Sequence, residues 1–144
     1  MDESKINFKI VVKSELSELD RIRSVLEDKL HFIELIERNR IVLVVDEILS
    51  NIIEHGYKLN PNNLIEIEVE VLNQEKIIIK IYDDAPHFDL SKTSNPNLME
   101  HSTEGKPRGL GLFLVRSIVD EIQYQPKYPQ GNINILIKKI NQFL

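Results

Sequence analysis

The stretch from Leu64 to Tyr82, LIEIEVEVLNQEKIIIKIY, contains the strongest strand signals in the chain. Its first half alternates apolar residues with glutamates, which predicts a strand with one buried face and one solvated face. Its second half, Lys76–Tyr82, is almost continuously apolar and predicts a strand nearer the centre of a sheet. Because only residues 73–75 separate the two halves, the stretch predicts a β-hairpin.

Upstream of this hairpin, the periodicity predicts one strand and two helices. Apolar residues alternate over Ile6–Val12, which is the spacing of a half-buried strand. A first helix is expected after Ser14 or Ser17, either of which can serve as its N-cap. A second helix is expected to start near residues 39–40, because apolar residues then recur at i, i+3, i+4 and i+7. Gly56 is its expected end.

Downstream of the hairpin, residues 83–108 show no periodicity and are rich in Pro, Ser, Thr and Asn. Loops longer than about 12–15 residues within a compact domain are commonly functional lids or disordered segments. A third helix is expected over Leu112–Ile122. Two final strands are expected over Ile122–Gln125 and Asn132–Ile140, joined by a turn at Lys127–Gly131.

Strands that come in adjacent pairs, with few helices, favour an α+β fold over a doubly wound parallel sheet. We therefore expect one domain over residues 1–144: a two-layer sandwich with a mixed, largely antiparallel sheet and helices on one face.

Composition narrows the possible functions. The 144 residues carry a net charge of −5 without a basic stripe, which argues against nucleic-acid binding. The absence of cysteine excludes disulfides and thiolate metal sites. No apolar run approaches the roughly 20 residues of a membrane span, and the acidic N-terminus does not resemble a secretory signal. We expect a soluble, cytoplasmic protein that does not bind membranes.

The first candidate motif is the pair Glu47 and Asn51 on the second predicted helix. Residues four apart lie one turn above each other on the same side of a helix, here beside the apolar stripe. A carboxylate can take a proton from a hydroxyl or water, and an amide oxygen is a suitable Mg²⁺ ligand. Taken alone, the pair is more typical of an ordinary solvated helix face.

The second motif, Asp83-Asp84-Ala85-Pro86, follows the apolar strand. A carboxylate held at a strand end can accept a hydrogen bond from an exocyclic amine such as that of adenine. The alternative is a turn in which Asp caps local backbone amides.

The third motif is Gly105–Leu112, GKPRGLGL, which opens the third predicted helix. Gly109 and Gly111 allow the backbone to approach an anion, and a helix N-terminus offers free amides. Lys106 and Arg108 add positive charge nearby. The alternative is a simple glycine-rich helix entry.

The order of these motifs resembles that of the GHKL (Bergerat) ATP-binding fold, to which histidine kinases belong. Within it, the chain resembles the anti-sigma-factor serine/threonine-protein kinases of bacterial partner-switching systems. The resemblance runs from about Phe8 to Ile140 and is carried by four stretches: VVDEILSNIIEHGY, IYDDAPHFDL, PRGLGLFLVRSIVDEIQYQ and GNINILIKKI.

The resemblance implies a role for each motif. Glu47 is implied as the general base, and Asn51 as the ligand of Mg²⁺ bound with ATP. Asp83 is implied as the adenine contact, with Ala85 at a position where the family often has Gly. Residues 86–108 are implied to form an ATP lid.

The same resemblance places Gly109 and Gly111 at the phosphates, with Leu110 and Leu112 beside them. Lys106 and Arg108 are both displaced from the usual position of the lid cation.

The implied reaction transfers the γ-phosphate of ATP to a serine of a STAS-type anti-anti-sigma protein, which competes with a sigma factor for this chain. The alternative is a non-catalytic ATP-binding module that sequesters a sigma factor or another regulator. Relatives commonly form homodimers, and the strand Ile6–Val12 could supply an edge for such pairing.

Overall fold

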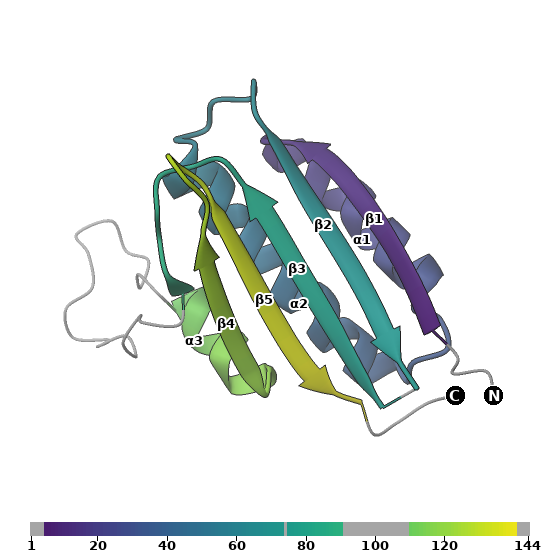
Figure 1. Ribbon diagram of the computed structural model, residues 1–144. Helices are drawn as coiled ribbons and strands as arrows, with labels where there is room; N and C mark the ends of the chain where they lie inside the picture. Colours follow the sequence, from purple (N-terminus) through teal and green to yellow (C-terminus); the bar gives the residue numbers. More distant parts are fainter. Residues whose placement is uncertain (1–4, 74, 91–109, 141–144) are drawn as a thin grey trace.

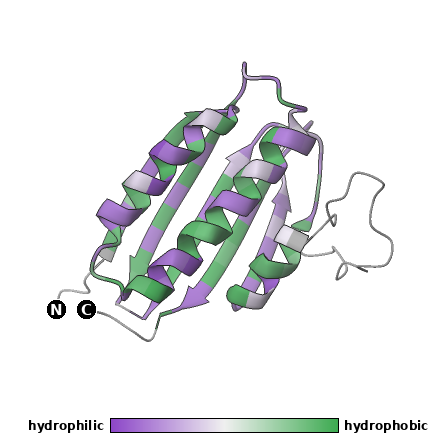
Figure 2. Cartoon of the chain, turned by 180° about the vertical axis from the view of Figure 1, so that it is seen from behind, coloured by the Kyte–Doolittle hydropathy of each residue, from purple (hydrophilic) through white to green (hydrophobic). Residues whose placement is uncertain are grey.

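A computed structural model describes residues 5–73, 75–90 and 110–140 of the chain. Five strands form one sheet in the order β1-β2-β3-β5-β4, and the helices α1, α2 and α3 all lie on one of its faces (Figures 1 and 2). The predicted α+β two-layer sandwich is confirmed. All four strand pairings are antiparallel, so these strands contain none of the parallel pairing that a mixed sheet would have.

The predicted hairpin consists of β2 (Leu64–Leu72) and β3 (Lys76–Asp83). Ile65, Ile67, Val69 and Val71 of β2 are buried, and the glutamates that alternate with them point to the other face. The preceding strand β1 (Lys5–Lys13) pairs with β2 at the edge of the sheet. The strand alternation therefore assigned the buried face of β2 correctly.

The first two helices begin at residues other than those expected. A short 3-10 turn, η1 (Leu16–Glu18), leads into α1 (Leu19–Lys29), and neither predicted serine caps it. Ser14 is fully buried and instead bonds Asn60 O at 2.5 Å and Asn63 N at 3.2 Å.

Helix α2 (Leu35–Asn51) starts several residues before the expected position. Its N-cap is Glu34, whose carboxylate accepts hydrogen bonds from the amides of Ile36 and Glu37. Glu is not among the preferred capping residues, so the usual sequence signal for a helix start is absent here. The helix continues into a π-helical turn, η2 (Ile52–Gly56), which ends at the predicted glycine.

The C-terminal part consists of α3 (Leu110–Ile118), β4 (Glu121–Pro126) and β5 (Asn132–Lys139). Helix α3 begins and ends earlier than expected. Lys138 fixes its C-terminal end by donating to Ile118 O at 3.4 Å while pairing with Glu37 of α2. Strand β5 lies between β3 and β4, which brings the start of β5 beside the end of β3.

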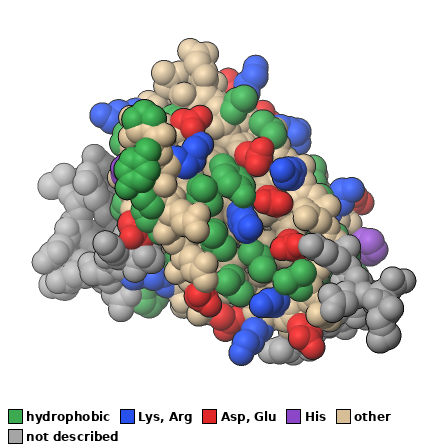
Figure 3. Space-filling model, in the orientation of Figure 1, with side chains coloured by type: hydrophobic (Ala, Val, Ile, Leu, Met, Phe, Trp, Pro, Cys, Tyr) green, Lys and Arg blue, Asp and Glu red, His purple; other side chains and the backbone are tan. Residues whose placement is uncertain are grey.

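The core lies between the helices and the sheet and is built mainly from Ile, Leu and Val. No helix of the described residues covers the opposite face of the sheet. It carries half-buried side chains such as Ile78 and Ile137 among charged ones (Figure 3). Within the described residues, no helix is long and apolar enough to cross a lipid bilayer.

Candidate functional site

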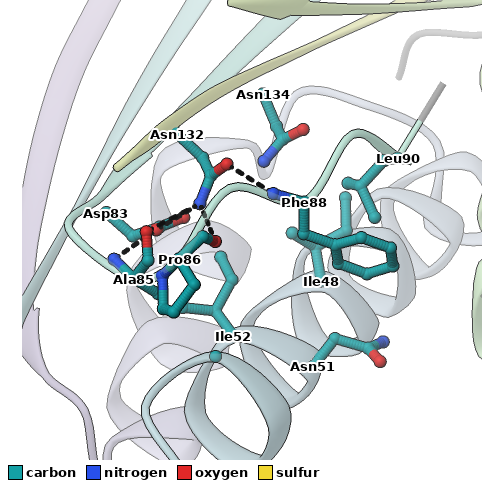
Figure 4. A pocket seen from close by; sticks show the side chains of 11 residues that line it. Ile48, Asn51, Ile52, Asp83, Ala85, Pro86, Phe88, Leu90, Asn132 and Asn134 are labelled. Atoms are coloured by element: carbon teal, nitrogen blue, oxygen red, sulfur yellow. Dashed lines mark hydrogen bonds between the residues drawn. The ribbon is translucent and has the colours of Figure 1, made fainter. Parts of the chain in front are cut away.

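A pocket lies where the end of α2 and the turn η2 meet the adjoining ends of β3 and β5 (Figure 4). About 330 Å³ of space among its lining residues is not filled by atoms, and part of this space is open to solvent. The lining combines aliphatic side chains with a few polar ones: Ile48, Asn51, Ile52, Gly56, Asp83, Ala85, Pro86, Phe88, Leu90, Asn132 and Asn134.

Asp83 is the most buried acid in this pocket, with 2% of its surface exposed. It is the last residue of β3, and its Oδ1 accepts hydrogen bonds from Ala85 N at 2.9 Å and Asn132 Nδ2 at 2.8 Å. Its Oδ2 is buried and has no hydrogen-bond partner among the described residues. Burial raises the pKa of Asp83, while the bond from Asn132 acts in the opposite direction.

An unpaired carboxylate oxygen in a buried position is costly unless a ligand completes its hydrogen bonding. The oxygen can only accept when the group is ionised, so it suits a ligand that presents an N–H donor. Asp83 therefore has features of both interpretations of this motif, a local turn and a ligand contact. Its Oδ1 caps the turn by accepting from Ala85 N, and its Oδ2 is left without a partner among the described residues.

Glu47 and Asn51 lie on the last turns of α2, where Asn51 lines the pocket and Glu47 does not. Asn51 Nδ2 donates to Glu47 O at 2.8 Å, so its amide oxygen is the group left to serve as an acceptor. Glu47 is half-buried, and burial, with smaller contributions from Asp46 and Glu54, raises the pKa of its carboxyl. The pair is therefore not a fully solvated helix face.

Gly111, in the first turn of α3, packs against Glu47. A Cβ at this position would overlap Glu47 Oε2 and lie 2.9 Å from Glu47 Cδ. A side chain at this position would therefore force the Glu47 carboxylate to move. The structure brings together two residues that the sequence had placed in separate motifs.

The remaining predicted site residues are placed as follows. Ala85 is buried at the pocket wall against Gly56, where a Cβ would lie 2.9 Å from Ala85 Cβ. Leu110 begins α3, and Leu112 is buried in the core, so its side chain points away from a ligand. Three predicted residues lie outside the described part of the chain: Lys106, Arg108 and Gly109. Most of the predicted lid, residues 86–108, lies there too.

Sequence reasoning missed Asn132, which contacts Asp83 directly, and Phe88, whose ring lies at the pocket (Figure 4). A usable signal was present, since Asn132 and Asn134 occupy alternate positions of a predicted strand. Polar residues at core-facing strand positions are unusual unless they are hydrogen-bonded or line a site.

The fold and site together define an α+β domain with a small-molecule pocket at one end of its sheet. A model of the histidine kinase-like ATPase domain family matches residues 12–138. The chain belongs to this family, whose members share an ATP-binding domain.

Its sequence is similar to a serine-protein kinase RsbW from Staphylococcus aureus strain MSSA476, with 34% identity over 106 residues. That match covers 67% of this chain and 62% of the relative, so the chain spans less than two thirds of that protein.

Solved structures share the fold. The RsbU and RsbW domains of a Mycobacterium tuberculosis protein superpose with a TM-score of 0.64 at 13% identity, covering 96% of this chain and 33% of that one. The histidine kinase domain of a blue-light activated kinase from Erythrobacter litoralis gives a TM-score of 0.52 at 18% identity, with coverages of 89% and 61%.

Proposed function

We propose that the pocket binds ATP, with the adenine at Asp83 and the phosphates toward Gly111 and the start of α3. The observation that carries this proposal is the buried, unpaired Oδ2 of Asp83. The exocyclic amine of adenine would supply the missing donor, whereas the O6 carbonyl of guanine would face it with a second acceptor. Membership of an ATPase family supports the same nucleotide.

We propose further that the chain is a protein-serine kinase. Glu47 would take the proton of a serine hydroxyl as the serine oxygen bonds to the γ-phosphorus and the bond from that phosphorus to the bridging oxygen of ADP breaks. Partial burial and the raised pKa of Glu47 favour this role, because a base works best when its pKa lies nearer the operating pH. The remaining contribution is positioning and charge neutralisation.

The residues present suit Mg²⁺ held mainly by ATP. No cluster of three or more His, Cys, Asp or Glu able to hold a metal occurs among the described residues. Mg²⁺ in kinase sites is commonly held by one or two protein groups plus phosphate oxygens. Asn51 could supply such a ligand, because it lines the pocket and its Nδ2 is occupied by Glu47 O, which leaves its amide oxygen for a metal.

We propose a STAS-type anti-anti-sigma protein as the phosphorylated substrate and a sigma factor as the competing partner, which makes the chain an anti-sigma factor. The similarity to serine-protein kinases RsbW supports this proposal. A homodimer is proposed on the same basis, and light scattering across micromolar concentrations tests it, with a monomer throughout as the contradicting result.

Two measurements test the proposed function in sequence. Isothermal titration with ATP and with GTP, each with Mg²⁺, should give heat for ATP and much less for GTP. Absence of heat and of a thermal shift at millimolar ATP would overturn the nucleotide proposal. A STAS protein recovered by pull-down from the native cell is then incubated with the chain and labelled ATP, and phosphoserine is measured.

The second candidate is an ATP-binding module that sequesters its partner without phosphorylating it. Ala85 favours this alternative, because its methyl group occupies buried space beside the proposed adenine position. Binding of both ATP and the STAS protein without any phosphoserine would establish it. Phosphoserine formation would exclude it.

A further inference from the structure

Asn132 stands out because its buried side chain bonds to several parts of the pocket wall (Figure 4). It is the first residue of β5 and lies directly across the ladder from Asp83. Its Nδ2 donates to Asp83 Oδ1 at 2.8 Å and to Pro86 O at 3.0 Å, with Ala85 O at 3.4 Å. One amide group thus holds both the carboxylate and the backbone that follows β3.

The oxygen of the same amide is also occupied. Asn132 Oδ1 accepts from Phe88 N at 2.9 Å and from the Tyr124 hydroxyl at 2.5 Å. With both hydrogens of Nδ2 and both lone pairs of Oδ1 engaged, Asn132 has no group to offer a ligand. Any contribution to binding must therefore act through Asp83 and Phe88, which both line the pocket.

We propose that Asn132 is a positioning residue for nucleotide binding: it holds Asp83 Oδ1 so that Oδ2 faces the adenine, and it fixes Phe88 at the pocket. This inference rests on the proposed binding of ATP. It predicts that loss of the amide weakens ATP binding even where the fold survives. An interaction with a charged group is worth about 1.5–3 kcal/mol, so a loss of at least tenfold in affinity is expected.

The role has a signature in the titration of Asp83. Burial raises the pKa of this carboxyl, and the bond from Asn132 is the largest opposing influence. The backbone N–H of Ala85 and the side chain of Lys127 also lower its pKa, and Asp84 raises it. The hydroxyls of Tyr57 and Tyr124 interact electrostatically with the same carboxyl. Removing the Asn132 amide raises the pKa of Asp83 further. When pH is lowered, Asp83 of the variant therefore becomes protonated, and loses its adenine contact, at a higher pH than in wild type.

The test compares wild type with Asn132→Ala and a matched control, Gln130→Ala. Gln130 also donates a side-chain amide hydrogen bond to this segment, to Asp84 O at 2.7 Å, but does not contact Asp83. ATP affinity is titrated from pH 5 to pH 9, and the Asp83 carboxyl is followed by carbon NMR without nucleotide. In Asn132→Ala both the affinity midpoint and the Asp83 titration should move to higher pH, while Gln130→Ala should follow wild type.

Tyr124→Phe serves as a second variant, because it removes only the hydroxyl that bonds Asn132 Oδ1 and keeps the ring. It should shift both midpoints in the same direction by a smaller amount, and it decides the matter if Asn132→Ala does not fold. Unchanged midpoints in a folded variant, with only a lower melting temperature, would overturn the proposal. Wild type that binds no ATP would instead overturn the proposed function, and the NMR titration would still decide whether Asn132 controls Asp83.

Discussion

The two ends of the pocket are built differently. At the end proposed to bind the base, here called the base end, Asp83, Ala85 and Asn132 are 2–3% exposed, and the side chains of Asp83 and Asn132 bond to each other and to backbone. At the end proposed to bind the phosphates, here called the phosphate end, the side chains of Glu47 and Asn51 are half-buried, and Gly111 lies against Glu47. No hydrogen bond to the Glu47 carboxylate joins it to another described residue, and Asn51 makes a single one through Nδ2.

This difference indicates what each end does. The base end is preorganised: the polar groups of Asp83 and Asn132 are paired except at Asp83 Oδ2, which suits recognition of a fixed shape. The neighbouring Asn134 Oδ1 is a second buried oxygen without a partner among the described residues. The phosphate end keeps a carboxylate and an amide oxygen available for groups that arrive with the ligand. Substitutions at the phosphate end should therefore affect rate, and substitutions at the base end should affect affinity and stability.

The largest expected effect comes from Glu47→Gln. The amide keeps the size of the side chain but cannot accept the serine proton, so phosphoryl transfer should slow by roughly 10²–10⁴-fold with ATP affinity almost unchanged. Wild-type activity should fall as pH is lowered through the raised pKa of Glu47, and the residual activity of the variant should lack that step. Single-turnover rates measured across pH check both.

Glu54→Gln is the matched control, because it makes the same chemical change about two turns further along at an exposed position. It should retain a wild-type rate, with its activity profile moved slightly to lower pH, since Glu54 contributes to the raised pKa of Glu47. A wild-type rate in Glu47→Gln would remove Glu47 as the base and leave the kinase proposal standing.

Gly111→Ala should have the next largest effect. The added methyl group would overlap the Glu47 carboxylate and displace it, and a misplacement of about 1 Å can cost roughly 10²-fold in rate. In a Glu47→Gln background the same substitution should cost much less, because both act through one side chain. Equal losses in the two backgrounds, measured by single-turnover kinetics, would show that Gly111 acts independently of Glu47.

Much of the fold could be predicted because the strand and helix periods were strong. The alternation in β2 assigned its buried face, and Gly56 marked the end of the second helix. Helix starts were wrong where the cap was unusual, as with Glu34, or where a serine bonded across the fold, as with Ser14. Such contacts join residues far apart in sequence, so local propensity does not report them.

The site was only partly predictable for a similar reason. Motif order predicted a single site containing Glu47, Asn51 and Asp83. The structure has Asn51 and Asp83 lining one pocket, whereas Glu47 does not line it. Asn132 was missed because the hydropathy pattern of β5 predicts that its isoleucines, and not its asparagines, face the core. At this end of β5 the opposite holds: Asn132 and Asn134 are each 3% exposed on the helix side, and Ile133 lies on the open side.

Asp83→Asn tests the base end and should weaken ATP binding by about 1–3 kcal/mol, or roughly 5- to 150-fold, because a donor would replace the unpaired acceptor. The same change should raise the melting temperature at neutral pH, since it removes a buried charge. The pKa of Asp83 is raised on folding, so the wild type loses stability as pH rises through that pKa and the variant does not. Melting curves across pH, with nucleotide titrations, check both effects.

The smallest functional effect is expected from Ala85→Gly, which removes one methyl group from the pocket wall. ATP affinity should rise by less than about tenfold, because the space beside the adenine widens. Stability should fall by about 1 kcal/mol through lost burial and added chain entropy.

Gly56→Ala alone should destabilise by about 1–3 kcal/mol, since its new Cβ would lie 2.9 Å from Ala85 Cβ. Combined with Ala85→Gly that clash disappears, so the double variant should be more stable than the sum of the two single losses, as measured by denaturant unfolding. Additive losses would mean that the two residues do not share this space, and that Ala85 does not set the width of the pocket at its base end.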